Sequence, residues 1–293
     1  FLWLESEIDK ANAAGEKVLL AVHHPVISPW DVYAHLVDFE MFGGYRRLWK
    51  LMCEKGVRVI FTGHTHVQNI RKYTDAEGRY FYDVSTTALV TAAGNMRKVT
   101  VDTEKSTCEV ESVRIDQIKN FDTGGKNFHD YIYHLNFIGR IEDALPLASK
   151  DWNAFIETAE GALPVDKLQA HKGLAKFGIK RLENLKLKTL AKFGRKYSGI
   201  TKEEIRAIGG QKALPKLFQI AARVFSGNGP FPPKTAEYKA FMGTVMRLDK
   251  ILRRVKPELL QKLVPEGQTL ADVAEPFVYN NRTGDDDHIV IPL

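Results

Sequence analysis

A strand–helix–strand succession near the start of this 293-residue chain most constrains its fold. Residues 18–22 and 57–62 are short, mostly apolar runs of the kind that form buried strands. Between them, apolar side chains recur at helical spacing, and Gly56 ends the pattern; these side chains are Tyr45, Leu48, Trp49 and Met52. A strand, a helix and a second strand in close succession form a βαβ unit, so we expect the two strands to be parallel neighbours.

Both predicted strands end in histidines. His23 and His24 lie in the Val-His-His-Pro segment at residues 22–25, and His64 and His66 lie in the Gly-His-Thr-His segment at residues 63–66. Imidazole is the commonest metal ligand among side chains, and ligands bind at the carboxyl ends of strands in open α/β sheets. The sequence therefore predicts a metal site where the two strands end.

The backbone periodicity suggests how these histidines are oriented. In an extended segment His64 and His66 share one side, and Gly63 allows close backbone approach. If the pleat of the first strand continues, His24 points away from His23. We therefore expect His24 to lie outside the ligand set, next to the ligands or facing solvent.

The chain changes character after the βαβ unit. Residues 70–74 and 79–84 flank a turn and predict a β-hairpin, and residues 96–102 and 108–115 predict a second one. We expect these antiparallel strands to complete one mixed sheet. The pattern breaks near residues 121–125, Phe-Asp-Thr-Gly-Gly, and we divide the chain there into an α/β domain at 1–118 and a mainly helical domain at 119–293.

The second domain shows several helix signals. Ile138, Ile141 and Leu145 indicate one helix, and Ser149 is a candidate N-cap for a helix over 151–160. Thr201 begins a capping box, and Thr235 precedes a long amphipathic helix. The pentapeptide Leu-Ala-Lys-Phe-Gly occurs at 174–178 and 190–194, either by chance or as two short helices that each end at glycine.

Near the end of the chain, residues 285–288 are Asp-Asp-Asp-His. We interpret them as a solvated acidic turn before a terminal strand at 289–291, in preference to a metal site. Residues 281–283 form an N-glycosylation sequon, which matters only in a secretory pathway. Cys53 and Cys108 are too few for a disulfide framework, and we expect buried free thiols.

Positive charge is concentrated in one part of the chain. The formal net charge is +6, yet residues 167–223 hold fifteen Lys and Arg against three Glu, an excess of twelve positive charges. This basic stretch, at about residues 165–225, is either a lysine-coated helical surface or an electrostatic contact for nucleic acid or anionic membrane. No apolar run reaches the roughly 20 residues that a membrane-spanning helix needs.

The two histidine segments occur in this order and on neighbouring strands. In this they resemble the second half of the catalytic domain of the calcineurin-like metallophosphoesterase family. The resemblance covers residues 1–118, and Trp3 and Leu4 before the first strand also fit the pattern of that family. The resemblance implies a two-layered α/β sheet flanked by helices. It also implies two divalent ions, drawn from manganese, iron, zinc, nickel or cobalt, with His23 and His64 on one ion and His66 on the other. The implied activity is hydrolysis of a phosphomonoester or phosphodiester by metal-bound hydroxide.

The earlier motifs of that family, Asp-X-His, Gly-Asp and Gly-Asn-His, do not precede the first strand. We therefore expect an N-terminally truncated domain with part of a dinuclear site, and no competent enzyme without the missing segment. Any signal peptide in that segment would be lost with it. The alternative is a non-catalytic module that binds nucleic acid or anionic membrane through the basic stretch.

Overall fold

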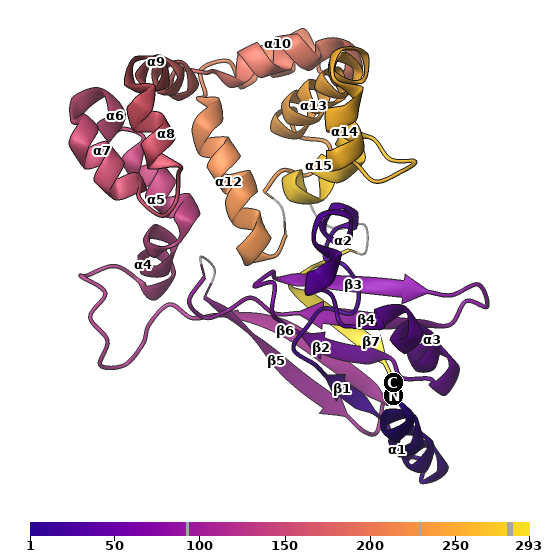
Figure 1. The fold of residues 1–293 in the computed structure, drawn as a ribbon. Coiled ribbons are helices and arrows are strands. Elements are labelled where there is room, and N and C mark those ends of the chain that lie inside the picture. The colour runs from indigo at the N-terminus through magenta and orange to yellow at the C-terminus, as the bar shows by residue number, and fades with distance from the viewer. Residues whose placement is uncertain (92–93, 229, 280–283) are drawn as a thin grey trace.

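The protein is a mixed α/β structure in which two small sheets lie below two groups of helices (Figure 1). The computed structural model describes residues 1–91, 94–228, 230–279 and 284–293. The predicted sequon at 281–283 lies outside these residues.

The first sheet contains the predicted βαβ unit. Its four strands have the order β1 (Leu19–Ala21), β2 (Val59–Thr62), β4 (Tyr80–Ser85), β3 (Asn69–Thr74). β1 and β2 are parallel neighbours, as predicted, and α3 (Tyr45–Lys55) connects them. Gly56 ends α3 with φ of 74°, a left-handed conformation that glycine adopts without steric cost. β3 and β4 form the predicted hairpin, and β4 inserts parallel to β2.

The second predicted hairpin is present but belongs to a separate sheet. β5 (Asn95–Asp102) and β6 (Thr107–Arg114) are antiparallel, and β7 (His288–Pro292) pairs with the other edge of β6. The expectation of one continuous sheet is therefore wrong. The terminal strand is present as predicted, yet it returns from the helical part to the β part of the molecule (Figure 1).

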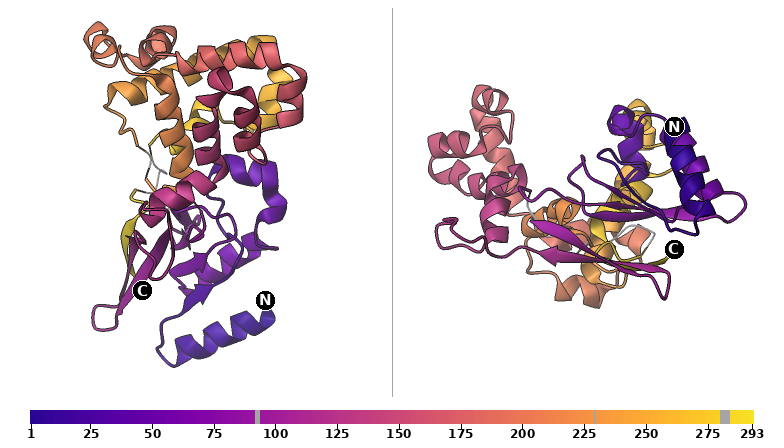
Figure 2. Two further views of the ribbon diagram at one scale, coloured as in Figure 1. Left: turned by 90° about the vertical axis from the view of Figure 1, so that its left-hand side faces the viewer. Right: turned by 90° about the horizontal axis from the view of Figure 1, so that it is seen from below.

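The two sheets stack as layers (Figure 2). The inner layer of apolar side chains joins Val59 and Ile70 of the first sheet to Cys108, Val110 and Ile291 of the second. On the opposite face of the first sheet, α1 (Leu2–Ala13) and α3 form a second core. Burying apolar side chains on both faces is what fixes this sheet in the middle of the β part.

The helices between β1 and α3 are short, and the helices from α4 onward form the helical part. Between β1 and α3 lie α2 (Asp31–Val37) and a 3-10 helix, η1 (Asp38–Glu40). The helical part comprises α4 (Phe128–Leu135), α5 (Phe137–Ala144), α6 (Leu147–Lys150), α7 (Trp152–Ala159), α8 (Val165–Ala170), α9 (Lys172–Glu183), α10 (Leu187–Ser198), α11 (Lys202–Ala207), α12 (Ala213–Ser226), α13 (Ala236–Val255), α14 (Pro257–Leu263) and α15 (Leu270–Val278).

Helix caps agree with the sequence in two places and differ in one. Thr201 forms the predicted capping box on α11, and Thr235 caps α13. The cap of α7 is Asp151, whose carboxylate accepts the backbone N–H of Asn153 and Ala154, so the expected cap at Ser149 is wrong. An ionised carboxylate also interacts favourably with the positive end of the helix dipole, which favours Asp in this position.

The repeated pentapeptide does not end two helices. Gly178 lies inside α9 and Gly194 lies inside α10, so of the two alternatives the one with two glycine stops is wrong. Gly194 is buried where α10 crosses α13, and a Cβ at this position would overlap the backbone of Gly243. The glycine at this position is therefore explained by close helix packing and not by helix termination.

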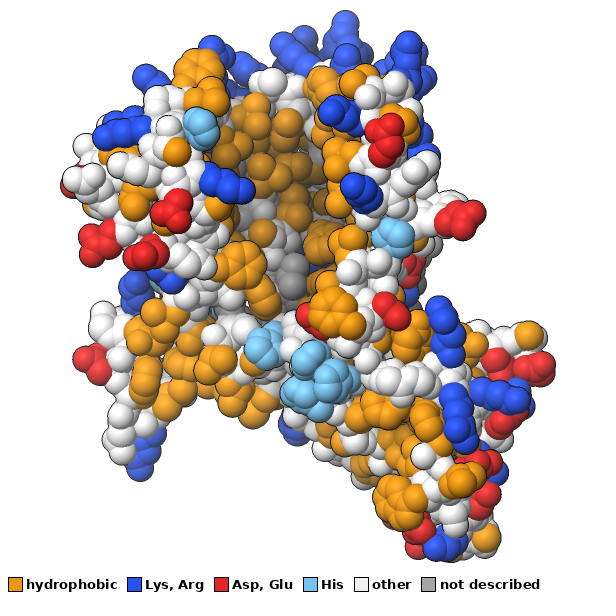
Figure 3. Space-filling model, viewed as in Figure 1, with side chains coloured by type: hydrophobic (Ala, Val, Ile, Leu, Met, Phe, Trp, Pro, Cys, Tyr) orange, Lys and Arg blue, Asp and Glu red, His pale blue; other side chains and the backbone are white. Residues whose placement is uncertain are grey.

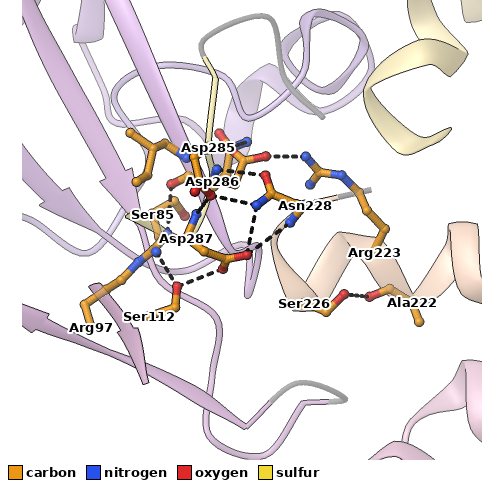
Figure 4. Close-up of polar contacts among 12 residues, drawn as sticks. Ser85, Arg97, Ser112, Ala222, Arg223, Ser226, Asn228, Asp285, Asp286 and Asp287 are labelled. Atoms are coloured by element: carbon orange, nitrogen blue, oxygen red, sulfur yellow. Dashed lines mark hydrogen bonds and ion pairs between the residues drawn. The ribbon is translucent and has the colours of Figure 1, made fainter. Parts of the chain in front are cut away.

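The acidic segment before β7 is not a solvated turn. Asp286 is fully buried and forms an ion pair with Arg223 of α12, which is also fully buried (Figure 4). The same carboxylate accepts hydrogen bonds from the side chain of Asn69 and the backbone N–H of Ile70. Asp286 thus joins β3, β7 and α12, three segments that are distant in the sequence.

Cys53 and Cys108 are free and buried, as expected. None of the helices in the described parts of the chain combines the length and the apolar character needed to cross a bilayer.

Candidate metal centre

The two histidine segments lie side by side because their strands are paired. The backbone N–H of Val22 donates to Phe61 O at 3.0 Å, and that of Gly63 donates to His23 O at the same distance. These bonds continue the β1–β2 pairing past the last residue of each strand. The backbone therefore holds both histidine loops next to each other at the carboxyl ends of β1 and β2, as the parallel arrangement predicts.

Three imidazole rings lie close together at these strand ends. The ring centroids of His23 and His64 are 5.1 Å apart, and those of His24 and His64 are 4.1 Å apart. His23 and His24 are separated by 5.4 Å. The expectation that His24 points away from His23 is wrong, because β1 ends at Ala21 and its pleat does not continue to His24.

His66 is held in a different way. It is exposed, and its carbonyl accepts a hydrogen bond of 2.8 Å from the hydroxyl of Thr87. His64 and His66 have φ of 64° and 56°, so the segment is not extended as expected. Left-handed backbone costs an L-residue about 1–2 kcal/mol, and such residues concentrate at functional sites where the surrounding fold enforces them.

A buried carboxylate that the sequence analysis did not identify anchors both loops. Asp83 on β4 accepts the backbone N–H of Val26 at 2.8 Å and of Ile27 at 2.7 Å, just after the first histidine segment. It also accepts the hydroxyl of Thr62 at 2.5 Å, just before the second segment. The signal in the sequence was a lone aspartate inside the apolar strand 80–85.

Burial dominates the electrostatics of Asp83. Removal from water raises its pKa from 3.8 to about 6, although the three hydrogen bonds favour the ionised form. Both oxygens of its carboxylate accept hydrogen bonds from the two loops, so Asp83 positions the histidines and is not available as a metal ligand in this arrangement.

The electrostatics of His64 favour a neutral ring. Burial lowers the pKa of His64, the neighbouring His24 and His23 lower it further, and Glu40 opposes them. A neutral imidazole is the form that binds metal ions. The cluster therefore presents a metal-binding form of His64 at neutral pH.

The ligand geometry fits a metal only in part. Within the described ranges, the only group of three or more His, Cys, Asp or Glu side chains with ligand atoms all within 4.8 Å of one another is Glu109, Glu111 and His288. The clustered imidazoles would thus have to rotate to share one ion. They fit a single transition metal better than a dinuclear pair, since imidazoles alone leave the charge of two dications uncompensated.

The Glu109, Glu111 and His288 group lies elsewhere, on neighbouring strands β6 and β7 of the second sheet. His288 contacts Glu109 at 3.0 Å, and Glu111 forms an ion pair with Lys98 at 3.0 Å. These contacts already satisfy both carboxylates on an exposed sheet face. The group is accounted for as a surface ion-pair network.

With the geometry of the histidine cluster established, comparison with known proteins adds no family: no family model matches the chain, and no curated protein matches it.

Proposed function

We propose that this chain carries the histidine-rich part of a metal-dependent phosphoesterase that hydrolyses a phosphomonoester or phosphodiester. The observation that supports this most strongly is the convergence of His23 and His64 at the carboxyl ends of paired parallel strands, 5.1 Å between ring centroids. The proposal retains the resemblance to calcineurin-like metallophosphoesterases stated above.

In this proposal, divalent ions bound by His23, His64 and His66 would activate water and neutralise charge on the phosphoryl group. His24 joins the set as a candidate ligand because its ring is the nearest to that of His64. Asp83 keeps both loops in place through their backbone and through Thr62. Residues that do not touch the metal but hold its ligands in place commonly control metal affinity.

Two divalent ions need carboxylate or amide ligands besides imidazoles. We propose that these come from protein outside the 293 residues. Each sheet has an edge strand that offers backbone groups to such a segment: β1 in the first sheet and β5 in the second. Apolar side chains are exposed on both, including Leu19, Val99 and Val101, which favours coverage by further chain.

The test separates metal binding from catalysis. Titration with Zn²⁺ or Mn²⁺ should show binding that His64→Ala weakens by roughly tenfold or more, while the exposed His171→Ala variant binds as wild type does. The chain extended by its upstream coding sequence should then hydrolyse bis(p-nitrophenyl) phosphate, and His66→Ala should abolish turnover. Equal metal binding by wild type and His64→Ala would refute the proposal.

A further inference from the structure

The two copies of the repeated pentapeptide have identical sequences but different surroundings. In α10, the second copy packs on α13, where Gly194 meets Gly243 and the Arg247 guanidinium lies 4.1 Å from the centroid of the Phe193 ring. In α9, the first copy leaves Leu174 and Phe177 with 73% and 59% of their surface exposed. The same apolar side chains that dock a helix in one copy are open to solvent in the other.

The geometry of α9 makes these side chains project. Leu174, Phe177 and Arg181 follow the i, i+3, i+7 spacing of one helix face, and the Arg181 guanidinium lies 5.0 Å from the centroid of the Phe177 ring. A Cβ on Gly178, next to Phe177, would have no neighbour within 4 Å. The opposite face, with Ala175 and Ile179, packs on the core of the helical part.

Charge surrounds this apolar face. From α9 to the end of α10, residues 172–198 hold nine Lys and Arg and one acidic residue, Glu183, an excess of eight positive charges. In the described parts of the chain, none of these nine side chains has a carboxylate oxygen within 4.0 Å. Lys and Arg side chains gather along the edge of the molecule formed by α9 and α10, the top of the view in Figure 3.

We propose that this basic edge, α9 and α10 with the exposed Leu174 and Phe177, docks the protein on a membrane surface rich in anionic lipid. Leu174 and Phe177 enter the boundary between headgroups and acyl chains, and the surrounding Lys and Arg contact anionic headgroups. The long Lys and Arg stems lie along the apolar boundary while their charged ends stay in water.

Charge and apolarity together select this partner. Nucleic acid would use the positive charge but gain little from Leu174, an aliphatic side chain that neither stacks on bases nor contacts phosphate. A second copy of the chain placed edge to edge would bring two excesses of eight positive charges together. The edge lies away from the sheets (Figure 1), so docking there does not cover the histidine loops at the end of β1 and β2.

Co-sedimentation of the full chain with vesicles tests the proposal, with phosphatidylcholine alone or mixed with phosphatidylserine. Wild type should bind the mixed vesicles and not pure phosphatidylcholine, and added salt should weaken binding. The Leu174→Ser/Phe177→Ser variant should bind at least tenfold more weakly. A second variant, Lys180→Glu/Arg181→Glu, should also lose binding, and circular dichroism checks that each variant stays folded.

The matched control is Leu135→Ser/Phe137→Ser, since these residues are 59% and 51% exposed at the junction of α4 and α5, outside the basic edge. It should bind vesicles as wild type does. Vesicle binding that survives Leu174→Ser/Phe177→Ser overturns the proposal. Binding of duplex DNA without vesicle binding overturns it in favour of nucleic acid, and self-association without vesicle binding overturns it in favour of a second copy.

Discussion

Asp83 offers the sharpest test of how the histidine loops are held, through the substitution Asp83→Asn. The asparagine carbonyl can accept the N–H groups of Val26 and Ile27, and its amide can donate to the Thr62 hydroxyl, so all three hydrogen bonds survive. Only the buried charge is removed. The variant therefore isolates the electrostatic cost of ionising Asp83 inside the protein.

The magnitude follows from the pKa. In the folded protein the pKa of Asp83 is raised from 3.8 to about 6, so protonation favours the folded state. Its contribution to stability is complete below pH 3.8 and is lost as the pH rises through about 6. Each tenfold change in proton affinity is worth about 1.4 kcal/mol, so the loss amounts to about 3 kcal/mol.

Urea unfolding at a series of pH values measures this effect. The difference in unfolding free energy between Asp83→Asn and wild type should grow in favour of the variant by about 2 kcal/mol between pH 4 and pH 7, since part of the effect is already lost at pH 4. Subtracting the two unfolding free energies cancels the contribution of the other carboxylates to the pH dependence. Asp83→Ala should be destabilised at every pH, because two backbone N–H groups lose a buried acceptor. A difference that does not change with pH would refute the assignment of a raised pKa.

Other substitutions test packing and the buried ion pair, each by urea unfolding. Gly178→Ala should stabilise the protein by up to about 1 kcal/mol, since a Cβ at this helix position meets no neighbour. Gly194→Ala should destabilise it by about 1–3 kcal/mol, because the Cβ would clash with Gly243. Equal effects of the two substitutions would contradict the packing argument. Arg223→Met should destabilise by about 3–5 kcal/mol by leaving Asp286 buried without its cation. Arg223→Met/Asp286→Asn should recover part of that loss, and a double variant less stable than the single one would contradict this account.

Sequence reasoning succeeded where the signal is local. The βαβ unit was predictable because strand and helix periodicity, together with the glycine at 56, are properties of consecutive residues. The capping box at Thr201 and the hairpins are equally local, since the interacting groups lie within a few positions of one another. The strands β1 to β4 and the helix α3 could be placed in this way.

Long-range pairing was not predictable from the same signals. Asp286 looks solvated beside two other aspartates, and its burial depends on Asn69 and Arg223, 217 and 63 positions away. The second sheet depends in the same way on β7 reaching β6. The repeated pentapeptide makes the point most directly, because one sequence occupies a buried and an exposed site.

The candidate site was predictable in its location but not in its detail. Strand pairing brought His23 and His64 together as predicted. The left-handed backbone of His64 and the inclusion of His24 follow from where the strands end, and a pattern of apolar residues fixes strand ends poorly. Asp83 was visible as a lone acid in a strand, but its partners lie on two other segments.

The pairing of β7 with β6 has a consequence for how the protein is made. Translation proceeds at about 5–20 residues per second, so the helical segment between these strands takes on the order of ten seconds or more to emerge from the ribosome. During that time β6 lacks one neighbour, and Cys108 and Val110 lack the cover that Ile291 later provides. The nascent β part therefore exposes an unpaired apolar strand edge, a substrate for chaperones, until the last strand arrives.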